Sequence, residues 1–147
     1  MQIQATLSNC TATVSDAILL VQGDTNPPLI LSINTDEYNY FTEITTSTPI
    51  NIANANIVLK IRKVNSNTIF STVPGIPIAG IMDYTDGSIN TDPPYDVPGI
   101  GGRVEFDWLI DSLTEYGMCQ GEIQITHADN GIQTVYDTIP IRIRQQF

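Results

Sequence analysis

The stretch IVLKIR at residues 57–62 decides the fold class of this chain. Successive side chains of a β-strand point to opposite faces, so the three aliphatic side chains at positions 57, 59 and 61 share one face. Lys60 and Arg62 share the other face with Val58. This period-two alternation indicates a strand that is buried on one face and solvated on the other.

Two further stretches repeat the alternation. In RVEFDW, at residues 103–108, Val104, Phe106 and Trp108 are expected to face a core, where the Trp108 indole N–H finds a backbone partner. The charged positions between them are expected to face solvent: Arg103, Glu105 and Asp107. Another inward-facing set belongs to an earlier strand: Leu29, Leu31 and Ile33.

A β-hairpin is predicted near the C-terminus. Residues 121–126 and 132–136 alternate, and the short polar connection between them contains Asn130-Gly131, two residues that tolerate positive φ. A last strand follows at residues 139–144, where Pro140 indicates a sheet edge or a strand start.

The chain as a whole is predicted to be all-β. No window of helical length places apolar residues at helical spacing without a Gly or Pro breaker. We expect an antiparallel Ig-like β-sandwich of about seven to eight short strands, with a closed barrel as the alternative. Residues 1–147 are expected to form a single domain, in which residues 1–16 supply an N-terminal arm or an extra strand and residues 86–101 an insertion loop.

The net charge argues against two classes of partner. It is −10, and phosphate backbones and anionic lipids both attract basic surfaces, so we expect neither nucleic acid nor membrane as a partner. No stretch approaches the roughly 20 apolar residues of a membrane-spanning helix. All basic residues fall in predicted strands: Lys60, Arg62, Lys63, Arg103, Arg142 and Arg144. Most acidic residues fall in predicted loops, which gives an acidic rim around a sheet face of mixed charge.

Residues suited to catalysis or metal binding are few. His127 has no Ser or Cys motif beside it, and Cys10 and Cys119 lack ligand-spaced partners, so we interpret both cysteines as small buried apolar residues. We predict no enzyme, no catalytic residue, no metal and no cofactor. Three carboxylate pairs occur without an implied cleft: Asp83 with Asp86, Asp92 with Asp96, and Asp107 with Asp111. Whether the loop at residues 83–92 binds a cation stays open, because it lacks the spacing of an EF-hand.

Aromatic side chains in expected loops are the candidate interface residues. They are Tyr38, Tyr40, Phe41, Tyr84 and Tyr95. Loop aromatics are enriched at protein interfaces and also stack on sugars, so protein contact, plain loop packing and sugar binding all stay open. The first three lie in a long loop expected at residues 35–49.

Four blocks of the sequence, taken in order, resemble the N-terminal domain of phage baseplate upper proteins, a module that also occurs as a stand-alone tail protein. They are VQGDTNPPL at residues 21–29, IANANIVLKIRK at 52–63, GRVEFDW at 102–108, and the hairpin and last strand at 117–144. The likeness extends from about Ile18 to the end of the chain. It departs from the family pattern at residues 118–120 and at the insertion of residues 86–101.

The resemblance implies a virion component that holds tail or baseplate parts together. We therefore expect a non-enzymatic structural or connector protein of a bacteriophage virion, in its tail, baseplate or neck, assembled in the host cytoplasm. Its partners would be other virion proteins, with many copies in a symmetric assembly. The alternatives are a capsid decoration or cement protein and a host-surface module that binds a carbohydrate or receptor. The sequence leaves the position in the particle, the partner, the host and the symmetry open.

Overall fold

The computed structural model describes residues 3–8, 17–83 and 85–147, and every regular element in these residues is a β-strand. The strands are β1 (Ile3–Ser8), β2 (Ile18–Val21), β3 (Leu29–Asn39), β4 (Ile44–Pro49), β5 (Asn56–Lys63), β6 (Ile69–Pro77), β7 (Ile81–Met82), β8 (Ile89–Asn90), β9 (Arg103–Phe106), β10 (Gly117–Thr126), β11 (Ile132–Thr134) and β12 (Ile139–Arg144). The expected all-β class is confirmed.

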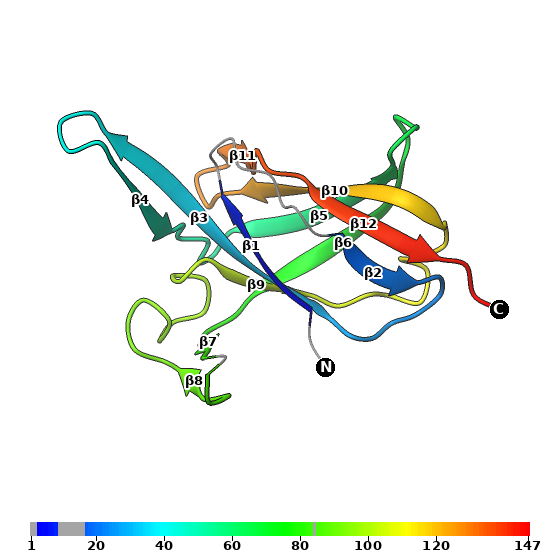
Figure 1. Ribbon diagram of the computed structural model, residues 1–147, viewed down its shortest axis with the longest axis horizontal. Helices are drawn as coiled ribbons and strands as arrows, with labels where there is room; N and C mark the ends of the chain where they lie inside the picture. Colours follow the sequence, from blue (N-terminus) through cyan, green and yellow to red (C-terminus); the bar gives the residue numbers. More distant parts are fainter. Residues whose placement is uncertain (1–2, 9–16, 84) are drawn as a thin grey trace.

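One mixed sheet of ten strands dominates the molecule. Its order is β1-β3-β9-β6-β5-β10-β12-β2, with β4 paired to β3 and β11 paired to β10. The inner pairs are antiparallel, whereas the pairs at the two ends of the path, β1 with β3 and β12 with β2, are parallel. Figure 1 shows this sheet curled into a half-barrel, with the two-stranded ribbon of β7 and β8 below it.

This sheet does not confirm the expected antiparallel Ig-like sandwich. A sandwich has two separate sheets, but β6 here pairs with β9 and so joins the strands from β1 to β2 into one hydrogen-bonded path. Gly75 of β6 lies opposite Phe106 of β9, and a Cβ atom at Gly75 would come within 2.7 Å of the Phe106 ring. The absence of that side chain leaves room for the ring inside the curve of the sheet.

The inward positions of the predicted alternation form the core. The inward positions of β3, β5 and β9 have no exposed surface: Leu29, Leu31, Ile33, Ile57, Leu59, Ile61, Val104 and Phe106. Each fully buried side chain of this kind contributes about 1.5–3 kcal/mol. Trp108 is also buried, and its Nε1 donates a hydrogen bond of 2.9 Å to the Pro27 carbonyl, as expected for an indole in a core.

Arg103 does not face solvent, contrary to the prediction from its strand. It is buried, and its Nη1 donates a hydrogen bond of 2.8 Å to Ser32 Oγ. The two residues are register partners across β9 and β3, and β9 has strands on both sides. Ser32 and Ile30, on the same face of the neighbouring strand β3, are buried as well, so this part of the sheet is covered on both faces. The local alternation within residues 103–108 could not indicate that cover.

The predicted C-terminal hairpin is confirmed. β10 and β11 pair antiparallel, Asn130 has φ of 68°, and the His127 N–H donates to the Gly131 carbonyl at 2.8 Å. The last strand, β12, lies between β10 and β2, so the edge interpretation of Pro140 is wrong. Pro140 stands instead near the start of the strand, before the pairing with β2 begins at Ile141.

The N-terminal residues contribute a strand in part. β1 pairs in parallel with β3 from Ile3 opposite Leu29 to Ser8 opposite Asn34. Cys10 and the rest of residues 9–16, with residues 1–2, lie outside the described residues. The single-domain extent stays a prediction. The described part of the chain contains no helix that could cross a membrane.

Candidate interaction site

The expected loop at residues 35–49 is a projecting β-ribbon. Beyond the pair Asn34–Pro49, β3 continues to Asn39 and pairs with β4 alone among the described residues. Residues 37–48 are all exposed, and Figure 1 shows the ribbon extending from the body of the molecule at the end opposite the C-terminus. We call residues 35–48 the arm. The sequence hid this ribbon because neither of its faces is buried, so no alternation of apolar and polar residues marks it.

The tip of the arm is held by one asparagine. Asn39 Oδ1 accepts hydrogen bonds from the N–H groups of Phe41 and Thr42 at 2.9 Å and 3.3 Å, and the Asn39 carbonyl accepts one from Glu43 N–H at 2.8 Å. Glu43 adopts φ of 56°, which closes the turn. Asn residues favour such turns because their short side chain bonds to the backbone two residues further on. The backbone of the tip is therefore held in one turn conformation by these hydrogen bonds.

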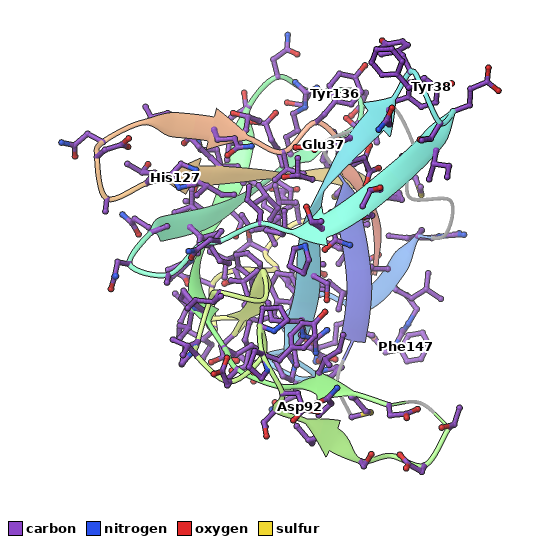
Figure 2. All side chains as sticks on the ribbon, turned by 90° about the vertical axis from the view of Figure 1, so that its left-hand side faces the viewer. Glu37, Tyr38, Asp92, His127, Tyr136 and Phe147 are labelled. Atoms are coloured by element: carbon purple, nitrogen blue, oxygen red, sulfur yellow. The ribbon has the colours of Figure 1, made fainter. Side chains whose placement is uncertain are left out.

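Three of the five expected interface aromatics gather at this tip. Tyr40 is 85% exposed and Phe41 is 100% exposed, and the Tyr38 and Tyr40 rings meet edge to face with centroids 4.9 Å apart. Figure 2 shows Tyr38 and its neighbour Glu37 on the arm. Aromatic rings held in water without burial are typical of surfaces that become covered by a partner.

The arm also carries negative charge. It contains Asp36, Glu37 and Glu43 and has no Lys, Arg or His. Its four-residue run Thr45-Thr46-Ser47-Thr48 adds hydroxyl groups and β-branched side chains, which favour an extended strand. The arm thus exposes aromatic, acidic and hydroxyl groups to solvent.

The other two aromatic candidates do not join this cluster. Tyr95 is half-buried, and its ring lies so close to Gly101 that a Cβ atom there would come within 2.4 Å of it. Its carbonyl accepts a hydrogen bond of 2.8 Å from Gly80 N–H. Tyr95 therefore packs within its own loop, and the lack of a side chain at Gly101 leaves space for its ring. Tyr84 lies outside the described residues.

The loop between β7 and β8 is closed by its own side chains. Asp83 Oδ1 accepts from the N–H and the hydroxyl of Thr85, and Asp86 Oδ1 accepts from those of Ser88. These bonds favour the ionised form and lower the pKa of both carboxyl groups below the ordinary range. No group of three side chains able to hold a metal occurs in residues 3–8, 17–83 and 85–147. Both carboxylates accept hydrogen bonds that stabilise the turns of this loop.

The remaining candidates for chemistry are dispersed. His127 stands at the end of β10, with its Nε2 3.0 Å from Gln133 Oε1, and Figure 2 shows it far from Asp92. Cys119 is buried with a free thiol, and burial raises its pKa, with Lys63 opposing and Glu115 assisting that shift. A thiol held protonated in a core is a packing group, as expected.

Sequence reasoning missed a second surface, on the outer faces of β10, β12 and β2. Met118, Arg142 and Leu19 are consecutive register partners across these three strands, and Leu19 is 73% exposed. A hollow lies beside this row. Its lining is Leu19, Leu20, Val21, Tyr116, Gly117, Arg142, Ile143 and Arg144. The sequence shows the alternating arginines of β12, but it does not show which residues of β10 and β2 lie beside them, because strand register decides that.

The fold and the arm define a class: an all-β domain with one curled sheet and a projecting, solvent-exposed β-ribbon. A solved structure shares this fold over nearly the whole chain. It is the N-terminal domain of phage TP901-1 ORF48, with a TM-score of 0.57 and 10% sequence identity, covering 97% of this chain and 98% of that chain. The chain matches no protein-family model, and no curated protein matches its sequence.

Proposed function

We propose that this chain is a non-enzymatic structural protein of a bacteriophage virion and that it connects parts of the tail, baseplate or neck through its arm. The observation that carries the proposal is the arm itself, a preformed ribbon that ends in exposed Tyr40 and Phe41. A two-stranded ribbon is marginally stable alone in water, so a partner that covers it would stabilise it. The shared fold with a phage protein domain supports a virion setting.

The physical character of the described surface also supports a structural role. The buried Arg103 bonds to Ser32, the buried Cys119 packs in the core, and the aspartates of the β7–β8 loop are bonded within their own turn. Acidic and aromatic groups at a projecting tip suit recognition of a protein surface that carries cations, because aromatic rings and carboxylates both attract them.

The test is incorporation into particles. Virions produced with the wild-type chain should contain it at a fixed copy number by quantitative mass spectrometry of gradient-purified particles. The double substitution Tyr40→Ser with Phe41→Ser should reduce that copy number at least tenfold. Ile110→Ser is the matched control, because Ile110 lies off the arm and is as exposed as Tyr40, at 85%. Its copy number should stay at the wild-type level.

Two outcomes would contradict the proposal. A chain that stays in the cleared lysate and is absent from purified particles is not a virion component. A chain that enters particles normally with both tip aromatics replaced does not use the arm as its connector. Electron microscopy of the particles would separate a tail, baseplate or neck position from capsid decoration.

A host-surface module is the second candidate, because exposed tyrosines also stack on sugars. The discriminating measurement is binding of the purified chain to a glycan array, with the Tyr40→Ser variant beside it. Saccharide binding that the substitution abolishes would favour this candidate over the connector.

A further inference from the structure

The outer faces of β5 and β12 carry a basic surface. Four cations lie on the outer faces of β5 and β12: Lys60, Arg62, Arg142 and Arg144. The carboxylate among them is Glu122, which is paired in register with Lys60. Within the described residues, none of the four cations forms an ion pair. This side of the sheet therefore carries a positive field on a chain whose net charge is −10.

The hollow lies within this basic surface. It has a volume of about 510 Å³, and Arg142 and Arg144 stand beside the apolar side chains of Leu19 and Tyr116 in its lining. Volumes of roughly 300–1,000 Å³ are typical of sites that hold a ligand group. Its chemistry suits an aromatic ring flanked by carboxylates.

Arg144 already contacts an aromatic ring within its own chain. The Phe147 ring centroid lies 4.6 Å from the Arg144 guanidinium carbon, and Phe147 is otherwise fully exposed. A guanidinium attracts the face of an aromatic ring, and the attraction is stronger when water is excluded. The same contact is available to an aromatic side chain supplied by another molecule.

The arm and the hollow lie at opposite ends of the molecule. In Figure 1, β5 and β12 run from the side of the arm toward the C-terminus, and β2 lies beside the C-terminal end of β12. The acidic aromatic tip of the arm is therefore directed away from the basic hollow of the same chain. Complementary surfaces that cannot meet within one molecule can meet between two copies.

We propose that the arm of one copy docks in the hollow of a second copy, head to tail. The inference rests on the proposed structural function and names the partner of the arm as the chain itself. Phe41 and Tyr40 enter the hollow against Leu19 and the Arg144 guanidinium, while Glu37 and Glu43 face Arg142 and Arg144. A head-to-tail contact of this kind closes into a ring or extends into a filament, which gives many copies per assembly.

Charge exchange between the two surfaces tests the contact. One variant combines Glu37→Lys with Glu43→Lys, and the other combines Arg142→Glu with Arg144→Glu. In the first variant both the arm and the hollow are cationic, and in the second both are acidic, so neither variant should bind to further copies of itself. In a mixture, the arm of each variant meets a hollow of opposite charge on the other variant. The control combines Asp96→Lys with Asp111→Lys, two exposed acidic residues off the arm, and changes the net charge by the same amount as the first variant.

Sedimentation velocity of the full chain over a concentration series gives the readout. The wild type and the control should form oligomers, each charge variant alone should associate at least roughly tenfold more weakly, and the equimolar mixture should regain oligomers. Circular dichroism of each variant should retain the wild-type strand signal, which shows that the loss of association is not loss of fold. Added salt should weaken the association.

Two results would overturn the inference. The first is a wild-type chain that stays monomeric at all concentrations, and the second is a mixture that fails to associate although both variants are folded. If arm substitutions nevertheless block entry into virions, the arm binds another virion protein, and the proposed function survives the failure of this inference. If the chains assemble in solution but never enter particles, the head-to-tail contact stands and the proposed virion function fails.

Discussion

Replacing Gly75 by Ala tests the feature that makes this fold one curled sheet. A methyl group at this position would lie 2.7 Å from Phe106 Cε1 and 2.7 Å from Val104 Cγ2, which is far inside van der Waals contact. Both neighbours have no exposed surface, so they cannot rotate into solvent to make room. Forcing one methyl group into a packed core costs about 1–3 kcal/mol.

The expected loss is measurable by thermal and urea unfolding. With an unfolding entropy of about 2.1 cal/mol/K per residue, each kcal/mol lowers the Tm of a chain of this length by about 3 °C, so the Tm should fall by about 3–10 °C. Trp108 is the single tryptophan and is buried, so its fluorescence reports unfolding of the core. Thr72→Ala, at an exposed position of the same strand, should change stability by no more than about 0.5 kcal/mol.

A second substitution identifies the clash as the cause. Phe106→Leu removes the ring that meets the new methyl group, so the double variant should be more stable than the sum of the two single effects predicts. A coupling energy of about 0.5–3 kcal/mol is expected for side chains in direct contact. An unchanged midpoint in Gly75→Ala would refute the pairing of β6 with β9 as described, and strictly additive effects in the double variant would place the clash on Val104 instead of Phe106.

Three further predictions concern single groups. Trp108→Phe removes the hydrogen bond to the Pro27 carbonyl and leaves that acceptor unpaired, so stability measured by circular dichroism should fall by about 1–3 kcal/mol. Burial raises the pKa of Cys119, so the unfolded chain loses the thiol proton at lower pH than the folded chain does. The contribution of this thiol to the free energy of unfolding should therefore be lost as pH rises through the folded pKa. The stability of Cys119→Ala should decline less over that alkaline range. Thr85→Ala removes a hydroxyl donor from Asp83, so the carboxyl pKa, followed by carbon-detected NMR, should rise toward its ordinary value while that of an unrelated aspartate stays constant.

The sequence by itself determined the all-β class and the inward-facing residues of the strands that are buried on one face. The alternation at residues 57–62, the inward positions of Val104, Phe106 and Trp108, and the Asn130-Gly131 turn are all local features, and the structure confirms them. They are readable because the two faces of a strand alternate with a fixed period, whatever the strand later pairs with.

The tertiary structure alone decided how those strands are joined. The path from β9 to β6, the parallel pairs at the two ends and the burial of Arg103 depend on which distant segments become neighbours. The arm escaped prediction for the opposite reason, since a ribbon exposed on both faces has no apolar period to display. The row of Met118, Arg142 and Leu19 exists only once strand register is set, because register is fixed by packing between segments far apart in the chain.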